Sequence, residues 1–143
     1  MKTLYNRNMI TTILLDIGGT VFIKKPDGTG TINPAIIYLN KHVPNSVQVV
    51  ILSDTDMFNV PELLQETFPE LRYDAIYTKM MHSWIDKTKP ETYTRICKTI
   101  NKDPSECILI DNLSEFKSAA ETIGIKTYDI DQDSINRLLK DLK

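Results

Sequence analysis

Apolar residues occur in short uninterrupted runs that are separated by polar or amphipathic stretches. The runs at 12–15, 47–53 and 107–110 consist mainly of aliphatic residues. Runs of this length and composition are typical of strands that are buried on both faces of a parallel sheet. Weaker runs at 74–77 and 125–128 predict two further strands.

Between these runs, apolar residues recur at helical spacing. Two sets follow the i, i+3, i+4, i+7 pattern of a buried helix face. The first set is Tyr93, Ile96, Cys97 and Ile100, and the second is Ile135, Leu138, Leu139 and Leu142. Prolines and polar caps at helix starts predict helices that end near residues 42, 68, 100, 123 and 142. Ser114 is the expected cap of the fourth helix, and Asp133 or Ser134 that of the fifth. Turn residues at 26–28 predict a loop or short hairpin.

The bulk composition is that of an ordinary globular protein. The 143 residues are 41% hydrophobic and 25% charged, and we expect one domain over 1–143. The net charge of −2 lacks the basic excess of a general nucleic-acid-binding protein. No apolar run approaches the roughly 20 residues that span a membrane. The N-terminus has no signal-peptide core, Met9 is an alternative start, and residues 1–9 are expected to form a mobile tail.

The cysteines change this picture little. Cys97 and Cys107 have neither a metal-ligand spacing nor a disulfide framework, and each lies in an apolar pattern. We therefore expect two buried thiols that pack as small hydrophobic groups, and a protein of the reducing cytoplasm.

Each of the three strong apolar runs is followed or closed by a polar residue: Asp16, Ser53 and Asp111. Open α/β sheets bind their ligands at the carboxyl ends of the strands. Gly18 and Gly19 allow the chain to turn sharply after Asp16 and to approach a ligand closely. Taken singly, Asp16 and Ser53 are better explained as turn residues or helix caps. Taken together, the three residues predict a site at one edge of the sheet.

The segment 16–21, with the sequence DIGGTV, resembles motif I of the haloacid dehalogenase (HAD) superfamily, which reads D-x-D-G-T-[LV]. Ser53, Lys89 and Asp111 follow in the order of the family's other three motifs. The resemblance implies a three-layer, Rossmann-like α/β fold with a mostly parallel sheet of about five strands. It also implies a HAD-type phosphoric monoester hydrolase, which is a Mg²⁺-dependent phosphatase.

The resemblance also assigns roles to these residues. Asp16 would attack the phosphoryl group and form an aspartyl-phosphate. Asp16, the backbone carbonyl of Gly18, and Asp111 would hold Mg²⁺, a hard cation that needs few protein ligands. Ser53 and Lys89 would bind the phosphoryl oxygens, and Lys89 would also keep Asp16 ionised.

Gly18 departs from the family pattern, in which an acid at this position protonates the leaving alcohol. Such an acid typically contributes about 10²–10⁴-fold to the rate. Three interpretations follow: a slow phosphatase that prefers good leaving groups, a phosphatase with a substitute acid such as Asp54 or Asp56, or a catalytically weakened binding or interaction module. Asp54 is also a candidate for contact with the substrate.

The spacing of the motifs leaves no room for a separate cap domain, because Ser53 follows Asp16 by 37 positions and Lys89 follows Ser53 by 36. An open site favours a phosphorylated substrate that is macromolecular or ends in a phosphate, or a cap supplied by a partner subunit. The loop Met80–Trp84 is the candidate surface for a partner or a second copy. The alternative is that this loop folds onto the core.

Overall fold

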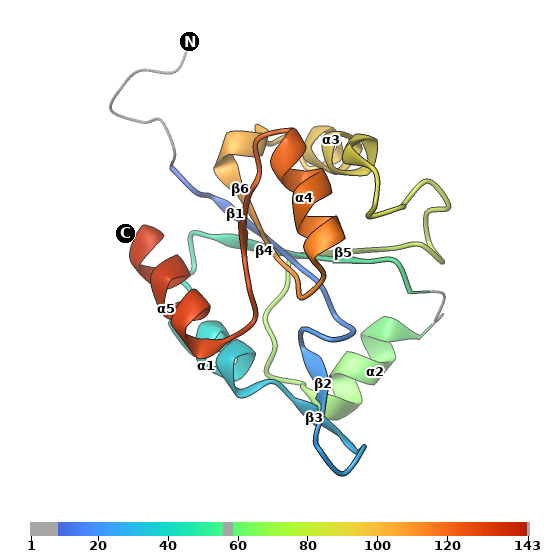
Figure 1. Cartoon of the computed structure of the whole chain (residues 1–143), viewed down its shortest axis with the longest axis vertical. Coiled ribbons are helices and arrows are strands. Elements are labelled where there is room, and N and C mark those ends of the chain that lie inside the picture. The colour runs from blue at the N-terminus through green and yellow to red at the C-terminus, as the bar shows by residue number, and fades with distance from the viewer. Residues whose placement is uncertain (1–8, 56–58, 143) are drawn as a thin grey trace.

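A parallel five-stranded sheet forms the centre of the protein (Figure 1). The computed structural model describes residues 9–55 and 59–142. The strand order is β5-β4-β1-β6-β7, and every pairing is parallel. The strands are β1 Thr12–Leu15, β4 Gln48–Ser53, β5 Ala75–Thr78, β6 Cys107–Ile110 and β7 Lys126–Tyr128. The predicted parallel sheet of about five strands is confirmed.

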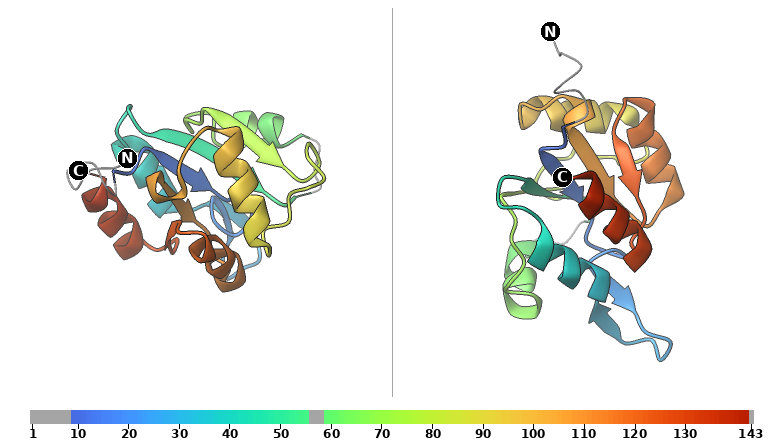
Figure 2. Two further views of the ribbon diagram at one scale, coloured as in Figure 1. Left: turned by 90° about the horizontal axis from the view of Figure 1, so that it is seen from above. Right: turned by 90° about the vertical axis from the view of Figure 1, so that its left-hand side faces the viewer.

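Helices cover both faces of this sheet. They are α1 Pro34–His42, α2 Val60–Thr67, α3 Pro90–Thr99, α4 Ser114–Thr122 and α5 Gln132–Asp141, with a short 3₁₀ helix at Pro104–Glu106. Side chains alternate across β1, so that Ile13 and Leu15 pack with α1, α2 and α5, whereas Leu14 packs with α3 and α4. The result is a three-layer α/β sandwich (Figure 2).

Two predicted helix caps are wrong. Ser114 is the first residue of α4, and Leu113 occupies the cap position without a side-chain hydrogen bond. Asp131, and not Asp133 or Ser134, caps α5 by accepting a hydrogen bond from the Ser134 backbone N–H at 2.9 Å. In both places the helix begins earlier than its pattern of polar residues indicates.

Asn33 joins three separate segments at the start of α1. Its side-chain oxygen accepts a hydrogen bond from the Ala35 N–H at 3.0 Å, which caps the helix. Its amide nitrogen donates to the carbonyls of Thr20 and Ile130, each at 3.1 Å. The turn after β1, the helix α1 and the segment before α5 are therefore fixed to one buried side chain.

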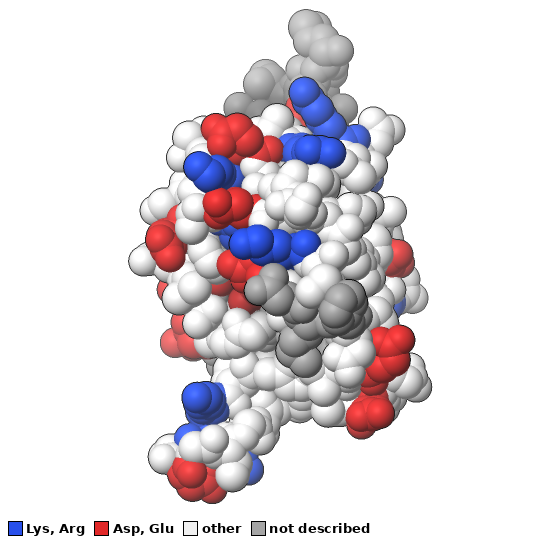
Figure 3. All heavy atoms as spheres, turned by 90° about the vertical axis from the view of Figure 1, so that its right-hand side faces the viewer, with Lys and Arg blue, Asp and Glu red and all other residues white. Residues whose placement is uncertain are grey.

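A small antiparallel hairpin follows the turn after β1, as the sequence allowed. It consists of β2 Phe22–Lys24 and β3 Gly30–Ile32, and it extends away from the sheet (Figure 2). Its exposed end carries charges of both signs, and basic and acidic side chains are interspersed on the face shown in Figure 3.

The described segments between the strands form no cap domain. Only the hairpin and α1 lie between β1 and β4, and only α2 is described between β4 and β5. The loop Met80–Trp84 lies largely against the body of the protein, since Trp84 packs on the α3–α4 core and Ile85 is completely buried. Met81 remains 45% exposed. Within the described residues, no helix is both long and apolar enough to cross a bilayer.

Candidate active site

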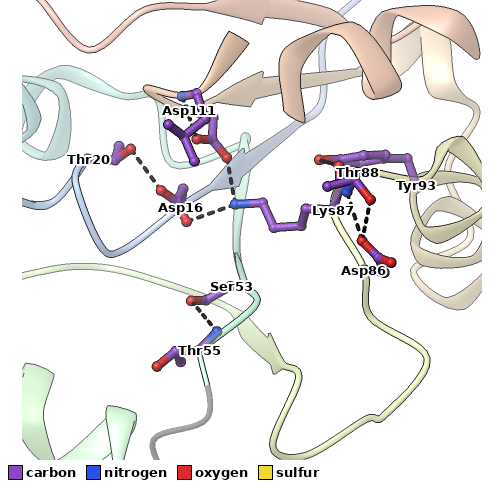
Figure 4. A network of polar contacts seen from close by, with 10 residues as sticks. Asp16, Thr20, Ser53, Thr55, Asp86, Lys87, Thr88, Tyr93 and Asp111 are labelled. Atoms are coloured by element: carbon purple, nitrogen blue, oxygen red, sulfur yellow. Dashed lines mark hydrogen bonds and ion pairs between the residues drawn. The ribbon is translucent and has the colours of Figure 1, made fainter. Parts of the chain in front are cut away.

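The polar ends of three adjacent strands meet at one edge of the sheet (Figure 4). Asp16 follows β1, Ser53 ends β4 and Asp111 follows β6. Leu15 lies opposite Ile110 in the parallel register, so the next residues, Asp16 and Asp111, emerge side by side. All three polar side chains are almost inaccessible to solvent. The structure thus brings together the three residues that the pattern of strand ends selects.

Lys87, and not Lys89, is the lysine of this site. The Nζ atom of Lys87 lies 2.8 Å from Asp16 Oδ1 and 2.5 Å from Asp111 Oδ2, and the side chain is completely buried. Lys89 is exposed and occupies the cap position of α3. The placement of Lys89 beside Asp16 is therefore wrong.

A tight turn before α3 explains the difference between the two lysines. Asp86 accepts hydrogen bonds from the backbone N–H and the hydroxyl of Thr88, and its carbonyl accepts one from the Lys89 N–H. The Tyr93 hydroxyl donates to the Lys87 carbonyl at 3.0 Å and fixes the backbone there. This turn leaves Ile85 and Lys87 completely buried, whereas Lys89 is exposed.

The site contains more negative than positive charge. One ammonium group faces two buried carboxylates, which leaves a net charge of −1 among these three side chains. Burial raises the pKa of Asp16 to about 6, and Asp111 adds to this effect, whereas the charge of Lys87 opposes it. The Thr20 hydroxyl donates to Asp16 Oδ2 at 3.0 Å. The ring of Phe116 lies 4.7 Å from Lys87 Nζ.

The donor set fits a magnesium ion. Asp111 Oδ1 accepts a hydrogen bond from the Leu113 N–H at 3.1 Å. Asp111 Oδ2 is buried and ion-paired with Lys87, yet it has no hydrogen-bond partner among the described residues. In the same part of the chain, no group of three or more His, Cys, Asp or Glu side chains could hold a metal ion. Two carboxylates and the Gly18 carbonyl are hard oxygen donors, and Mg²⁺ typically uses one or two carboxylates plus water and phosphate.

The two glycines after Asp16 are subject to different constraints. Gly19 has a φ of +78°, and a Cβ atom there would lie 2.7 Å from the Asn112 side-chain nitrogen. Gly19 is therefore required by the backbone and by packing. Gly18 has an ordinary φ, and a Cβ atom there would meet no atom within 4 Å. Space does not explain why Gly18 lacks a side chain.

A hollow of about 430 Å³ opens beside Asp16. Its polar lining includes Ser53 and the exposed Asp54. The side-chain oxygen Oγ of Ser53 accepts a hydrogen bond from the Thr55 N–H at 3.2 Å. Asp56, the other proposed substitute acid, lies outside the described residues. The rest of the lining is mainly apolar: Ile17, Phe22, Val60, Leu63, Leu113 and Phe116.

Solved structures share this architecture, although no protein-family model and no curated protein matches the sequence. A HAD-superfamily hydrolase of subfamily IA from Geobacter sulfurreducens superposes with a TM-score of 0.74 at 8% identity, over 96% of this chain and 98% of that chain. A HAD-family enzyme from Bacteroides thetaiotaomicron, in complex with magnesium and inorganic phosphate, gives 0.70 at 15% identity, over 84% and 93%. The chain has the fold of the HAD superfamily.

A third structure with the HAD fold is a phosphatase by name. It is the cobalt-bound deoxy-D-mannose-octulosonate 8-phosphate phosphatase from Haemophilus influenzae, with a TM-score of 0.59 at 12% identity, over 85% of this chain and 69% of that chain. A protein named as a phosphatase therefore shares this fold.

The two lysines provide a matched test of the charge balance. Lys87→Met leaves Asp16 and Asp111 buried without a cation, so we expect the free energy of unfolding at pH 7 to fall by about 3–5 kcal/mol. Lys89→Met removes an exposed charge and should change it by no more than about 0.5 kcal/mol. Urea unfolding followed by circular dichroism measures both. Similar losses in the two variants would contradict the assignment of Lys87.

Asp16→Asn should stabilise the protein above pH 6. Because burial raises the pKa of Asp16 from 3.8 in the unfolded chain to about 6, ionisation of this carboxyl destabilises the fold as the pH rises through this window. Asparagine does not ionise, so the variant gains up to about 3 kcal/mol at pH 7, and the gain disappears near pH 4. Thermal unfolding across this range, with the exposed Asp54→Asn as control, measures it. A gain that is the same at every pH would exclude this cause.

Proposed function

We propose that the protein is a Mg²⁺-dependent phosphatase that acts through Asp16. The observation that supports this most directly is the contact of the buried Asp16 carboxylate with Lys87 at the carboxyl edge of a HAD-type sheet. Phosphoryl transfer requires a positioned nucleophile and positive charge beside the phosphoryl oxygens. Asp16 and Lys87 supply these two elements, and the hollow beside Asp16 gives a substrate access.

Each residue then has a defined task. The Asp16 carboxylate attacks phosphorus and forms an aspartyl-phosphate, which water hydrolyses. Lys87, in the role first predicted for Lys89, balances the charge of Asp16 and donates to a phosphoryl oxygen. The Ser53 hydroxyl donates to a second oxygen. Asp16, Asp111 and the Gly18 carbonyl would hold Mg²⁺, which when bound offsets negative charge on the nucleophile and the phosphoryl group.

The competing proposal is a catalytically weakened binding or interaction module with the same site. The observation that favours it is Gly18, since no side chain at this position protonates the leaving group. Cytoplasmic location, a macromolecular substrate and self-association or partner binding through the loop Met80–Trp84 stay predictions from the sequence.

Hydrolysis of p-nitrophenyl phosphate separates the two proposals. We expect turnover that requires Mg²⁺ and that falls at least about 10³-fold in Asp16→Asn, because the nucleophile is removed. Lys87→Met should lose activity in the same assay, whereas Lys89→Met should retain it. If the wild-type protein is folded but no faster than Asp16→Asn, the binding-module proposal is the better one.

Gly18→Asp tests whether the missing acid limits the rate. The position has open space for a side chain, so the variant should fold normally. We expect hydrolysis of an alkyl phosphate such as glycerol 3-phosphate to rise by about 10²–10⁴-fold, the usual contribution of a general acid. Gly18→Asn has the same size but no acid, and it should give no gain. Equal gains in both variants would show that proton donation is not the cause.

A further inference from the structure

Most of the side chains that line the hollow beside Asp16 are apolar, and together they form its apolar wall. Its side chains come from separate parts of the chain: Phe22 from β2, Val60 and Leu63 from α2, and Leu113 and Phe116 from the start of α4. Apolar side chains donate no hydrogen bonds to a phosphoryl group. They can contact the remainder of a phosphorylated substrate, which must lie in the hollow while its phosphorus is at Asp16.

Leu113 is the most exposed part of this wall. It occupies the cap position of α4, where serine, threonine, aspartate or asparagine normally accepts a hydrogen bond from the first turn. Leucine makes no such bond, and 43% of it is exposed. Its backbone N–H donates to Asp111 Oδ1 at 3.1 Å, which holds the backbone of Leu113 next to the site carboxylate. Leu113 therefore gives α4 no side-chain cap, and it adds an apolar surface to the hollow beside Asp16.

The chemistry at Gly18 restricts the leaving group in the same direction. With no acid at this position, the leaving oxygen departs as an anion. An alkoxide is a poor leaving group without a proton. A phenol is much more acidic than an alkyl alcohol, with a pKa of about 10 for the side chain of tyrosine, and its anion spreads charge into the ring. An aromatic ring would also fill the space between Phe22, Leu113 and Phe116.

We propose that the substrates of this site are aryl phosphates, the phosphate monoesters of phenols, with the ring held against Phe22, Leu113 and Phe116. This inference rests on the proposed phosphatase function. In the first step the Asp16 oxygen bonds to phosphorus, and the bond between phosphorus and the aryl oxygen breaks with its electron pair on oxygen. The aryloxide then takes a proton from water. In the second step water attacks phosphorus, its proton passes to phosphate or solvent, and the Asp16 carboxylate is restored.

Three substrates separate the ring from the leaving group. Phenyl phosphate has both an aromatic ring and an acidic leaving group, benzyl phosphate has the ring on an alkyl oxygen, and acetyl phosphate has a good leaving group without a ring. With wild-type protein and Mg²⁺, we expect kcat/KM for phenyl phosphate to exceed that for benzyl phosphate by at least about 10²-fold. Equal values would overturn the inference.

Leu113→Ala tests the contact with the ring. It should raise KM for phenyl phosphate at least about fivefold, because apolar contact area is lost, and it should leave acetyl phosphate unchanged. Tyr38→Ala is the matched control, since Tyr38 is 40% exposed and lines a separate hollow. Leu113→Ala with an unchanged KM for phenyl phosphate, or with equal losses on both substrates, would overturn the role of the apolar wall.

Two further outcomes complete the test. A loss in Asp54→Asn that is confined to benzyl phosphate would show that Asp54 donates a proton, and it would overturn the argument from Gly18. Turnover of none of the three substrates, acetyl phosphate included, would contradict the proposed function itself. The source of the ring, free phosphotyrosine or a phosphotyrosyl peptide, is then identified by the higher kcat/KM of the two.

Discussion

The buried ammonium group of Lys87 is the contact on which the site depends. Asp16 and Asp111 end neighbouring strands in register, so their carboxylates are forced together in a place that water hardly reaches. Two like charges at such a position repel strongly unless a cation lies between them. Lys87 comes from the connection between β5 and α3, which is remote from both in the sequence. Its ion pairs therefore join the centre of the sheet to this connection.

The sequence predicts the framework of this site better than its details. The strands are predictable because buried parallel strands are continuous apolar runs, and Asp16, Ser53 and Asp111 follow because such strands end at one edge. The choice between Lys87 and Lys89 was not predictable from the sequence, since it depends on a turn built from Asp86. The predicted cap of α4 was wrong for a related reason. Local preference selects Ser114, whereas Leu113 occupies the cap position in the structure.

Gly18 and Gly19 show why adjacent identical residues need separate explanations. Gly19 is fixed by backbone conformation and by the nearby side chain of Asn112, so the fold accounts for it. Gly18 has room for a side chain and an ordinary φ, so the fold does not account for it. The fold therefore requires glycine at position 19 but would accept a side chain at position 18.

The three-way contact of Asn33 connects the segment before α5 to the turn that holds Asp16. Asn33 bonds to the carbonyls of Thr20 and Ile130, and the Thr20 hydroxyl holds Asp16. Local opening of the segment before α5 would remove one anchor of Asn33 and loosen the turn that carries Thr20. The turn after β1 and the helix α5 would then open as one cooperative unit, with linked rates of backbone amide exchange.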